Sequence, residues 1–138
     1  MSLETKKAEA VAQAGPTILV VDDDPSILRI VQLTLERSGY VVKTAANGQE
    51  AIKMLRKMVP AVLILDVTMP GMSGYEVCRS VKRDKRLENV PVVFLTAQGS
   101  PQDYKTGHDA GAVVYMVKPF NPEGLAQVVR MLSPPPEA

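Results

Sequence analysis

Four apolar runs in this sequence are followed by side chains that can bind a cation or take part in group transfer. The polar residues at their ends, in chain order, are Asp22, Asp23, Asp24, Asp66, Thr96 and Lys118. Each has an ordinary structural explanation when taken alone, because an acid after a strand commonly forms a turn or caps a helix. Asp24 fits that role best, since Pro25 and a helical pattern follow it. Their occurrence at all four ends favours a shared site.

Carboxylates gathered at one place repel one another unless a cation lies between them. Two such groups about 5 Å apart repel by roughly 3 kcal/mol at an effective dielectric near 20. If Asp22, Asp23 and Asp66 lie together, one of them is pushed towards its protonated form when no cation is bound. Mg²⁺, a hard ion that prefers oxygen ligands, relieves this repulsion. Lys118 and the Thr96 hydroxyl can meet the oxygens of a phosphoryl group, so the set predicts chemistry that makes an acyl phosphate.

The elements that must position these residues are strands and helices in alternation. Short β-branched runs alternate with helical stripes five times, which is typical of a parallel sheet covered by helices. The strand candidates are Thr17 to Asp22, Val41 to Ala46, Ala61 to Asp66, Val90 to Thr96 and Ala112 to Val117. Polar residues enter the second strand at Lys43 and Thr44, so we place it at the edge of the sheet. The carboxyl ends of parallel strands share one rim, where ligands bind.

A helix is predicted after each strand. The first begins after Asp24 and stops at Gly39, and its buried residues are expected to be Ile27, Ile30, Val31 and Leu35. The next three are predicted over about residues 48–58, 75–86 and 102–110, and the last carries the stripe Leu125, Val128, Val129 and Leu132. Few apolar residues anchor the fourth helix, so we expect it to be the element that moves.

Length and composition describe one ordinary domain. The 138 residues are 46% hydrophobic and 22% charged, and the net charge of +1 gives no field for binding nucleic acid. No apolar run approaches the roughly 20 residues that span a bilayer, and no secretory signal is recognisable. The single cysteine, Cys78, is expected in the core and His108 on the surface. We predict a flexible extension over 1–16, a domain over 17–132 and a Pro-rich tail or linker over 133–138.

Several segments resemble the receiver domain of two-component response regulators. They are Ile18 to Pro25, Leu65 to Gly74, Phe94 to Ala97 and Ala110 to Phe120, and the resemblance extends over about residues 17–132. It implies an α/β fold with a single doubly wound sheet of five parallel strands in the order 2-1-3-4-5. Such a sheet is flavodoxin-like, as in CheY, with helices on both faces.

The resemblance also implies a role for each polar residue at the rim. Asp66 would accept a phosphoryl group from a sensor histidine kinase or a histidine phosphotransfer protein. Mg²⁺ would be bound by Asp23, Asp66 and the backbone carbonyl of Thr68, with Asp22 assisting directly or through water. Lys118 would neutralise the phosphate, beside a cis bond to Pro119.

Thr96 and Tyr115 resemble a switch pair in which phosphorylation draws the hydroxyl and then the aromatic ring inward. The surface of the fourth helix, fifth strand and fifth helix would then bind a downstream protein or a fused output domain, and it is a candidate homodimer interface. The resemblance implies a cytoplasmic signalling protein that catalyses only its own phosphoryl transfer and autodephosphorylation, and no other enzymatic reaction.

Three alternatives use the same residues differently. A phosphohydrolase could form an aspartyl phosphate at Asp66, but that class has a second acid two residues later, where this chain has Thr68. A flavin carrier shares the topology, but the acidic turn after the first strand would repel a phosphate. A receiver that acts only as a phosphorylation-independent interaction module would not need the intact acids.

Overall fold

The computed structural model describes residues 15–97 and 101–135, and strands and helices alternate along them. The elements are β1 (Thr17–Val21), α2 (Pro25–Arg37), β2 (Val41–Ala45), α3 (Gly48–Leu55), β3 (Val62–Asp66), α4 (Gly74–Arg83), β4 (Val92–Thr96), α5 (Pro101–Ala110), β5 (Val114–Val117) and α6 (Pro122–Leu132). All neighbouring strands are parallel, in the order β2-β1-β3-β4-β5. The predicted fold, strand order and edge position of the second strand are confirmed.

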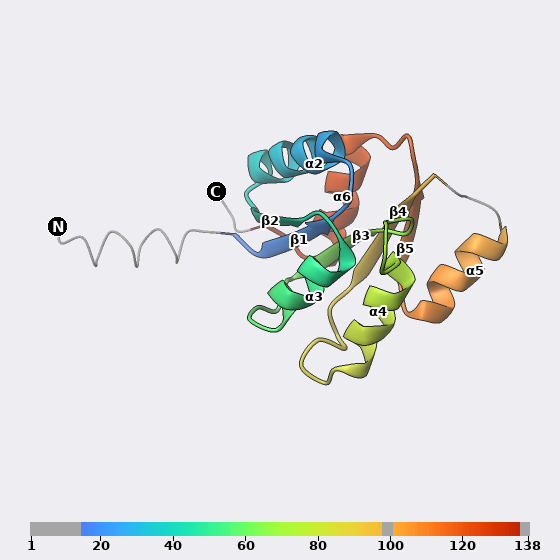
Figure 1. Cartoon of the computed structure of the whole chain (residues 1–138). Helices are drawn as coiled ribbons and strands as arrows, with labels where there is room; N and C mark the ends of the chain where they lie inside the picture. Colours follow the sequence, from blue (N-terminus) through green and yellow to red (C-terminus); the bar gives the residue numbers. More distant parts are fainter. Residues whose placement is uncertain (1–14, 98–100, 136–138) are drawn as a thin grey trace.

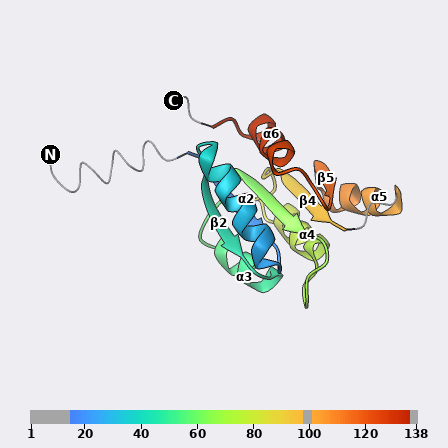
Figure 2. The same ribbon diagram turned by 90° about the horizontal axis from the view of Figure 1, so that it is seen from above.

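Helices cover both faces of the sheet. One face carries α2 and α6, and the other carries α3, α4 and α5 (Figure 1). Seen from above, α2 lies over the sheet, with β2 on one side of the molecule and β5 on the other (Figure 2). Every residue of β3 and β4 is buried, as expected for strands covered on both faces. The sheet therefore holds the carboxyl ends of its central strands in a rigid frame.

Side chains cap most of the helices at their amino ends. Asp24 accepts a hydrogen bond from the Ser26 amide at 2.9 Å, which confirms its predicted capping role. Asn47, Ser73 and Asn121 begin α3, α4 and α6 in the same way. These caps fix where each helix leaves the rim of the sheet.

The predicted ends of two helices were wrong. Helix α3 ends at Leu55 and α4 at Arg83, each three residues before the predicted end. The guanidinium of Arg86 donates to the carbonyls of Leu55 and Met58, so it satisfies the backbone where α3 stops. The end of α3 thus involves a contact with a residue far away in the sequence, and the spacing of apolar residues could not predict it.

Ile30 was also wrongly predicted to be buried. It is 45% exposed, whereas Val31 and Leu35 are fully buried. Consecutive residues of a helix point about 100° apart, and α2 packs on the sheet through the line that contains Val31. Cys78 is buried as predicted; its thiol donates to the Ala110 carbonyl, and burial raises its pKa to about 11.

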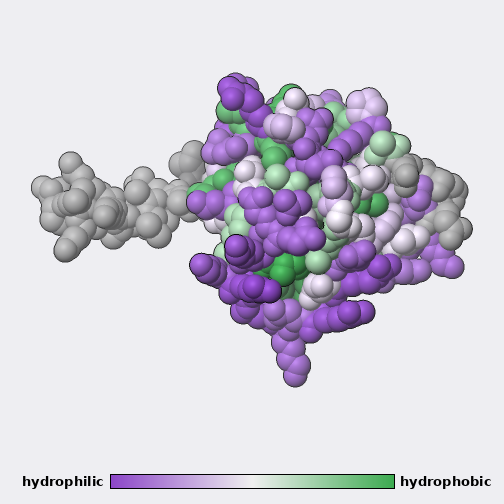
Figure 3. Space-filling view, in the orientation of Figure 1, coloured by the Kyte–Doolittle hydropathy of each residue, from purple (hydrophilic) through white to green (hydrophobic). Residues whose placement is uncertain are grey.

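The surface of the described residues is largely polar. His108 is exposed, as expected, and hydrophilic residues dominate the face shown in Figure 3. No helix in the described part of the chain is long and apolar enough to cross a membrane. Most of the predicted extension over 1–16 and half of the predicted tail over 133–138 lie outside the described residues, so these boundaries stay predictions.

Candidate functional site

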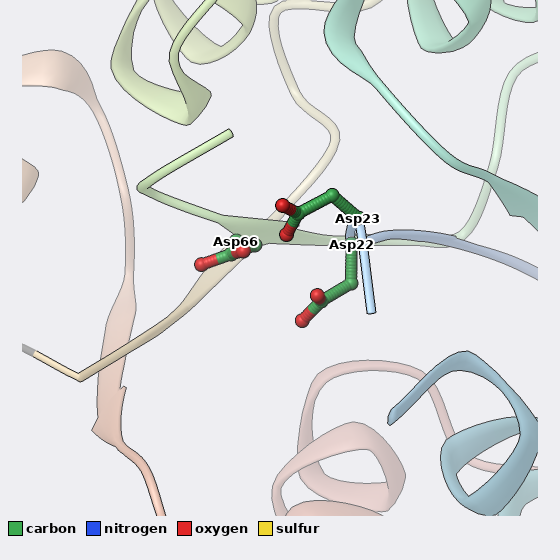
Figure 4. Close-up of side chains that lie close together, drawn as sticks. All are labelled: Asp22, Asp23 and Asp66. Atoms are coloured by element: carbon green, nitrogen blue, oxygen red, sulfur yellow. The ribbon is translucent and has the colours of Figure 1, made fainter. Parts of the chain in front are cut away.

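Three acids meet at the carboxyl ends of two neighbouring strands. Asp22 and Asp23 directly follow β1, and Asp66 is the last residue of β3. The pairing of Val21 with Leu65 places residues 22 and 66 level with each other. One oxygen of each acid lies within 4.8 Å of the others, and Figure 4 shows the three side chains gathered at the ends of the two strands. The predicted acid cluster of Asp22, Asp23 and Asp66 is therefore formed by the register of β1 and β3.

The three acids differ in their exposure to solvent. Asp22 is fully buried and Asp66 is 4% exposed, while Asp23 is open to solvent. The Asp22 carboxylate accepts hydrogen bonds from the Asp24 amide at 2.9 Å and from the Lys118 Nζ at 2.8 Å. Asp22 is thus held by two hydrogen bonds inside the protein, and Asp23 is the acid of the cluster that solvent reaches.

Lys118, at the end of the edge strand β5, brings a positive charge to the acid cluster. It follows β5, its amide donates to the Thr96 carbonyl, and its bond to Pro119 is cis, as the resemblance implied. Its Nζ lies 3.6 Å from Asp66 Oδ1 as well as 2.8 Å from Asp22. Burial alone lowers the pKa of Lys118, but hydrogen bonding to Asp22 and the charges of both acids raise it above its ordinary value. The lysine therefore stays charged.

Burial and the neighbouring acids together shift the protonation of Asp66. Burial, and then the charge of Asp22, raise its pKa from 3.8 to about 7, against the opposing effect of Lys118. This agrees with the electrostatic strain predicted from the sequence. The charge of Lys118 does not offset burial, the charge of Asp22 and the hydrogen bond with Asp23, so the pKa of Asp66 stays raised.

The loop after β3 folds tightly beneath Asp66. The Thr68 amide donates to Asp66 Oδ1 at 3.3 Å, and the Gly74 amide donates to the Val67 carbonyl. A Cβ on Gly74 would lie 2.3 Å from the Asp66 carbonyl oxygen, so only glycine fits there. Sequence reasoning missed the importance of Gly74; the signal was a glycine immediately after the capping residue Ser73.

The donor set fits a hard divalent cation. Its side chains offer only carboxylate oxygens, and one of them, Asp23, is accessible from solvent. Thr68 is bonded to Asp66 and so lies beside the same cluster. Oxygen donors without histidine or cysteine favour Mg²⁺ over zinc or copper. A bound cation would offset the charge of Asp22, which is one of the causes of the raised pKa of Asp66.

The predicted switch pair also lies together. Thr96, the last residue of β4, is fully buried, and Tyr115 on β5 is half-buried. The Tyr115 hydroxyl is hydrogen-bonded to Thr96 and lies 3.3 Å from the Tyr75 hydroxyl, and burial raises the pKa of Tyr115 above its ordinary value. Sequence reasoning did not single out Tyr75, since nothing in its spacing indicates a contact with β5.

Comparison with known proteins identifies the family. Residues 18–130 match the response regulator receiver domain. The chain belongs to this family. The resemblance to this family found in the sequence is therefore confirmed.

Two relatives and one solved structure illustrate the match. The chain is 45% identical to the probable transcriptional regulator ycf27 of Pyropia yezoensis, over 82% of this chain and 45% of that protein. It is 39% identical to the DNA-binding dual master transcriptional regulator RpaA of Synechocystis, over 85% and 48%. The chemotaxis response regulator CheY4 of Vibrio cholerae superposes with a TM-score of 0.80 at 38% identity, over 85% and 98%. The chain thus spans about half the length of these two regulators.

Proposed function

We propose that this receiver domain is phosphorylated on Asp66 and that phosphorylation controls a docking surface. The observation that carries the proposal is the environment of Asp66: a nearly buried carboxylate within 4.8 Å of two other acids and 3.6 Å from the ammonium of Lys118. A carboxylate kept only for structure would not need uncompensated acids beside it, because they destabilise the folded chain.

In the proposed reaction, Asp66 is the nucleophile. A carboxylate oxygen attacks the phosphorus of a phosphohistidine on a partner protein. The phosphorus–nitrogen bond breaks, and its electron pair returns to the imidazole ring as the acyl phosphate forms. Lys118 then balances the negative charge on the phosphoryl oxygens, and the Thr96 hydroxyl donates a hydrogen bond to one of them. In autodephosphorylation, water attacks the phosphorus and the Asp66 carboxylate leaves.

We further propose that Asp23, Asp66 and the Thr68 carbonyl hold Mg²⁺, with Asp22 in support. When bound, the cation neutralises charge on the phosphoryl oxygens during transfer. Asp22 also orients Lys118, because the Lys118 Nζ lies closer to the Asp22 carboxylate, at 2.8 Å, than to that of Asp66, at 3.6 Å.

The proposed partners follow from the family and from the place of the switch pair. A sensor histidine kinase or a histidine phosphotransfer protein would supply the phosphoryl group. The surface of α5, β5 and α6, which contains Tyr115, would bind a downstream protein, a fused output domain or a second copy of the chain. Two relatives are transcriptional regulators by name, so control of transcription is the proposed output. The cytoplasmic location stays a prediction.

The test is phosphorylation by a small donor. The protein is incubated with Mg²⁺ and acetyl phosphate, and intact mass spectrometry counts the phosphoryl groups added. We expect one group on the native protein, none on Asp66→Asn, and one on the control Asp24→Asn, because asparagine also caps a helix. Equal phosphorylation of Asp66→Asn would contradict the assignment, and an unmodified native protein would favour the phosphorylation-independent interaction module.

A further inference from the structure

Tyr115 is part of a group of four aromatic residues, here called the aromatic cluster: Tyr75, Phe94, Tyr104 and Tyr115. The ring of Tyr115 lies 4.7 Å from that of Tyr104 and 6.1 Å from that of Phe94. Tyr75 meets Phe94 edge-on at 5.1 Å. The aromatic cluster therefore connects α4, β4, α5 and β5 through contacts between side-chain rings.

A glycine in α5 makes room for this arrangement. A Cβ on Gly107 would lie 2.7 Å from Cδ2 of Tyr115 and 3.2 Å from Cδ2 of Phe94. Glycine in a helix interior is otherwise unfavourable compared with alanine. At this position it lets the Tyr115 ring pack directly against the helix backbone, which fits a ring seated between α5 and β4.

The hydroxyl of Tyr115 has two polar neighbours in this position. It is hydrogen-bonded to Thr96 on one side and lies 3.3 Å from the Tyr75 hydroxyl on the other. Tyr75 lies on α4, one residue after Gly74, and is not part of the acid cluster. Two elements that flank Asp66 therefore both contact the same switch side chain.

We propose that Tyr75 is a positioning residue of the switch, which holds Tyr115 inward against Thr96 and favours that conformer before phosphorylation. This inference rests on the proposed switch roles of Thr96 and Tyr115 and adds a residue to them. The contact between the two phenol hydroxyls exists only while Tyr115 is inward, so its free energy favours that conformer alone. Loss of one such hydrogen bond is expected to change the ratio of inward to outward conformers about fivefold.

The experiment compares Tyr75→Phe with Tyr104→Phe. Both variants remove one hydroxyl from a ring of the aromatic cluster, but only the first removes the hydroxyl that meets Tyr115. NMR of protein with ¹³C-labelled tyrosine rings follows the Tyr115 resonance between the Mg²⁺ form and the form saturated with beryllofluoride, a phosphoryl mimic. In the Mg²⁺ form, we expect Tyr75→Phe to lower the ratio of inward to outward Tyr115 conformers about fivefold, and Tyr104→Phe to change this ratio less than twofold. Equal ratios in the two variants would overturn the proposal.

Phosphorylation of the same samples separates this inference from the proposed function. Tyr75→Phe keeps the whole acid cluster, so saturating acetyl phosphate should still add one phosphoryl group. A native protein that takes up none would contradict the proposed function, while the conformer ratio would still report on Tyr75. Normal phosphorylation with an unchanged ratio would contradict the role of Tyr75 alone.

A double-mutant cycle gives a second, independent measurement. Urea unfolding is compared for the native protein, Tyr75→Phe, Tyr115→Phe and the double variant. If the two hydroxyls bind each other, their effects on the unfolding equilibrium constant should deviate from additivity by about fivefold. Additive effects would show that the hydroxyls act separately and would overturn the proposed contact.

Discussion

At the scale of single residues, the site depends on one lysine shared between two acids. Lys118 contacts Asp22 at 2.8 Å and Asp66 at 3.6 Å. Asp22 is buried and fixed by the Asp24 amide as well, so it can hold the lysine in place while Asp66 reacts. In the proposed mechanism, Lys118 transmits the new phosphoryl charge to the end of β5, where Tyr115 lies three residues earlier.

Lys118→Ala should separate phosphorylation from switching. A change of conformer ratio from 1:99 to 99:1 takes roughly 5.5 kcal/mol, and if Lys118 supplies a third of it the ratio falls about 20-fold. Acetyl phosphate should still modify Asp66 in this variant, while the ratio of switched to unswitched conformers should reach only about 5:1, so the Tyr115 resonance should stop measurably short of its fully switched position. Lys43→Ala, which removes an exposed lysine on β2, is the control. A fully switched Lys118→Ala protein would contradict the coupling role.

The raised pKa of Asp66 predicts a pH-dependent stability in the metal-free protein. In the folded state, Asp66 keeps its proton up to about pH 7, whereas in the unfolded chain it ionises near its ordinary 3.8. The folded state therefore binds more protons between these values, so its stability should fall as the pH rises from about 4 to about 7 and level off above that. Urea unfolding of metal-free protein should show this slope, and Asp66→Asn, which cannot ionise, should lose it. Parallel pH profiles for the two proteins would contradict the assigned pKa.

At the scale of elements, the loop between β3 and α4 decides how Asp66 is presented. Gly71 has a positive φ of 78°, a conformation that glycine adopts without strain. Gly74 lies against the Asp66 carbonyl with no space for a side chain. The two glycines allow the chain to turn back and start α4 close to the backbone of Asp66.

Two alanine substitutions of glycine should therefore have opposite effects. Gly74→Ala forces the Asp66 backbone to move and should destabilise the protein by about 1–3 kcal/mol, a size typical of strain in a packed interior. Gly124→Ala, in α6, meets only Asn121 Cβ at an ordinary 3.7 Å and should be neutral or stabilise by up to about 1 kcal/mol. Urea unfolding measures both changes, and similar values for the two variants would contradict the close approach at Gly74.

The sequence predicted the elements better than their ends. Continuous apolar runs, such as Val62 to Leu65, identified the buried strands because every residue of such a strand faces a helix layer. The early end of α3 could not be predicted, because it depends on Arg86 from another element. The exposure of Ile30 depends on how α2 is rotated about its axis on the sheet. The apolar pattern does not decide whether Ile30 or the adjacent Val31 faces the sheet directly.

At the scale of the whole molecule, the pairing of the strands in the sheet brings the residues of the site together. The acids lie far apart in the sequence, and only the parallel register of β1 and β3 brings them together. Their meeting was predictable, since the topology rules place all carboxyl ends at one rim. The aromatic cluster was not predictable, because it depends on side-chain packing between α4, α5 and the sheet edge.

Mg²⁺ should stabilise the whole fold by mass action. A ligand that binds only the folded state at 100 times its Kd adds about 2.7 kcal/mol to the free energy of unfolding. The native protein should thus unfold at higher urea in Mg²⁺ than in its absence, and Asp23→Ala should lose most of this gain. Asp24→Asn, adjacent in sequence and outside the acid cluster, should keep it. Retention of the full gain in Asp23→Ala would remove Asp23 from the proposed metal site.

A crystal structure grown with Mg²⁺ and beryllofluoride tests the central claim most directly. We predict beryllium bound to an Asp66 carboxylate oxygen, its fluorines in contact with Lys118 and Thr96, and Mg²⁺ held by Asp23, Asp66 and the Thr68 carbonyl. Beryllofluoride bound to any other residue, or Mg²⁺ located away from these acids, would contradict the assignment of Asp66 as the phosphoryl acceptor.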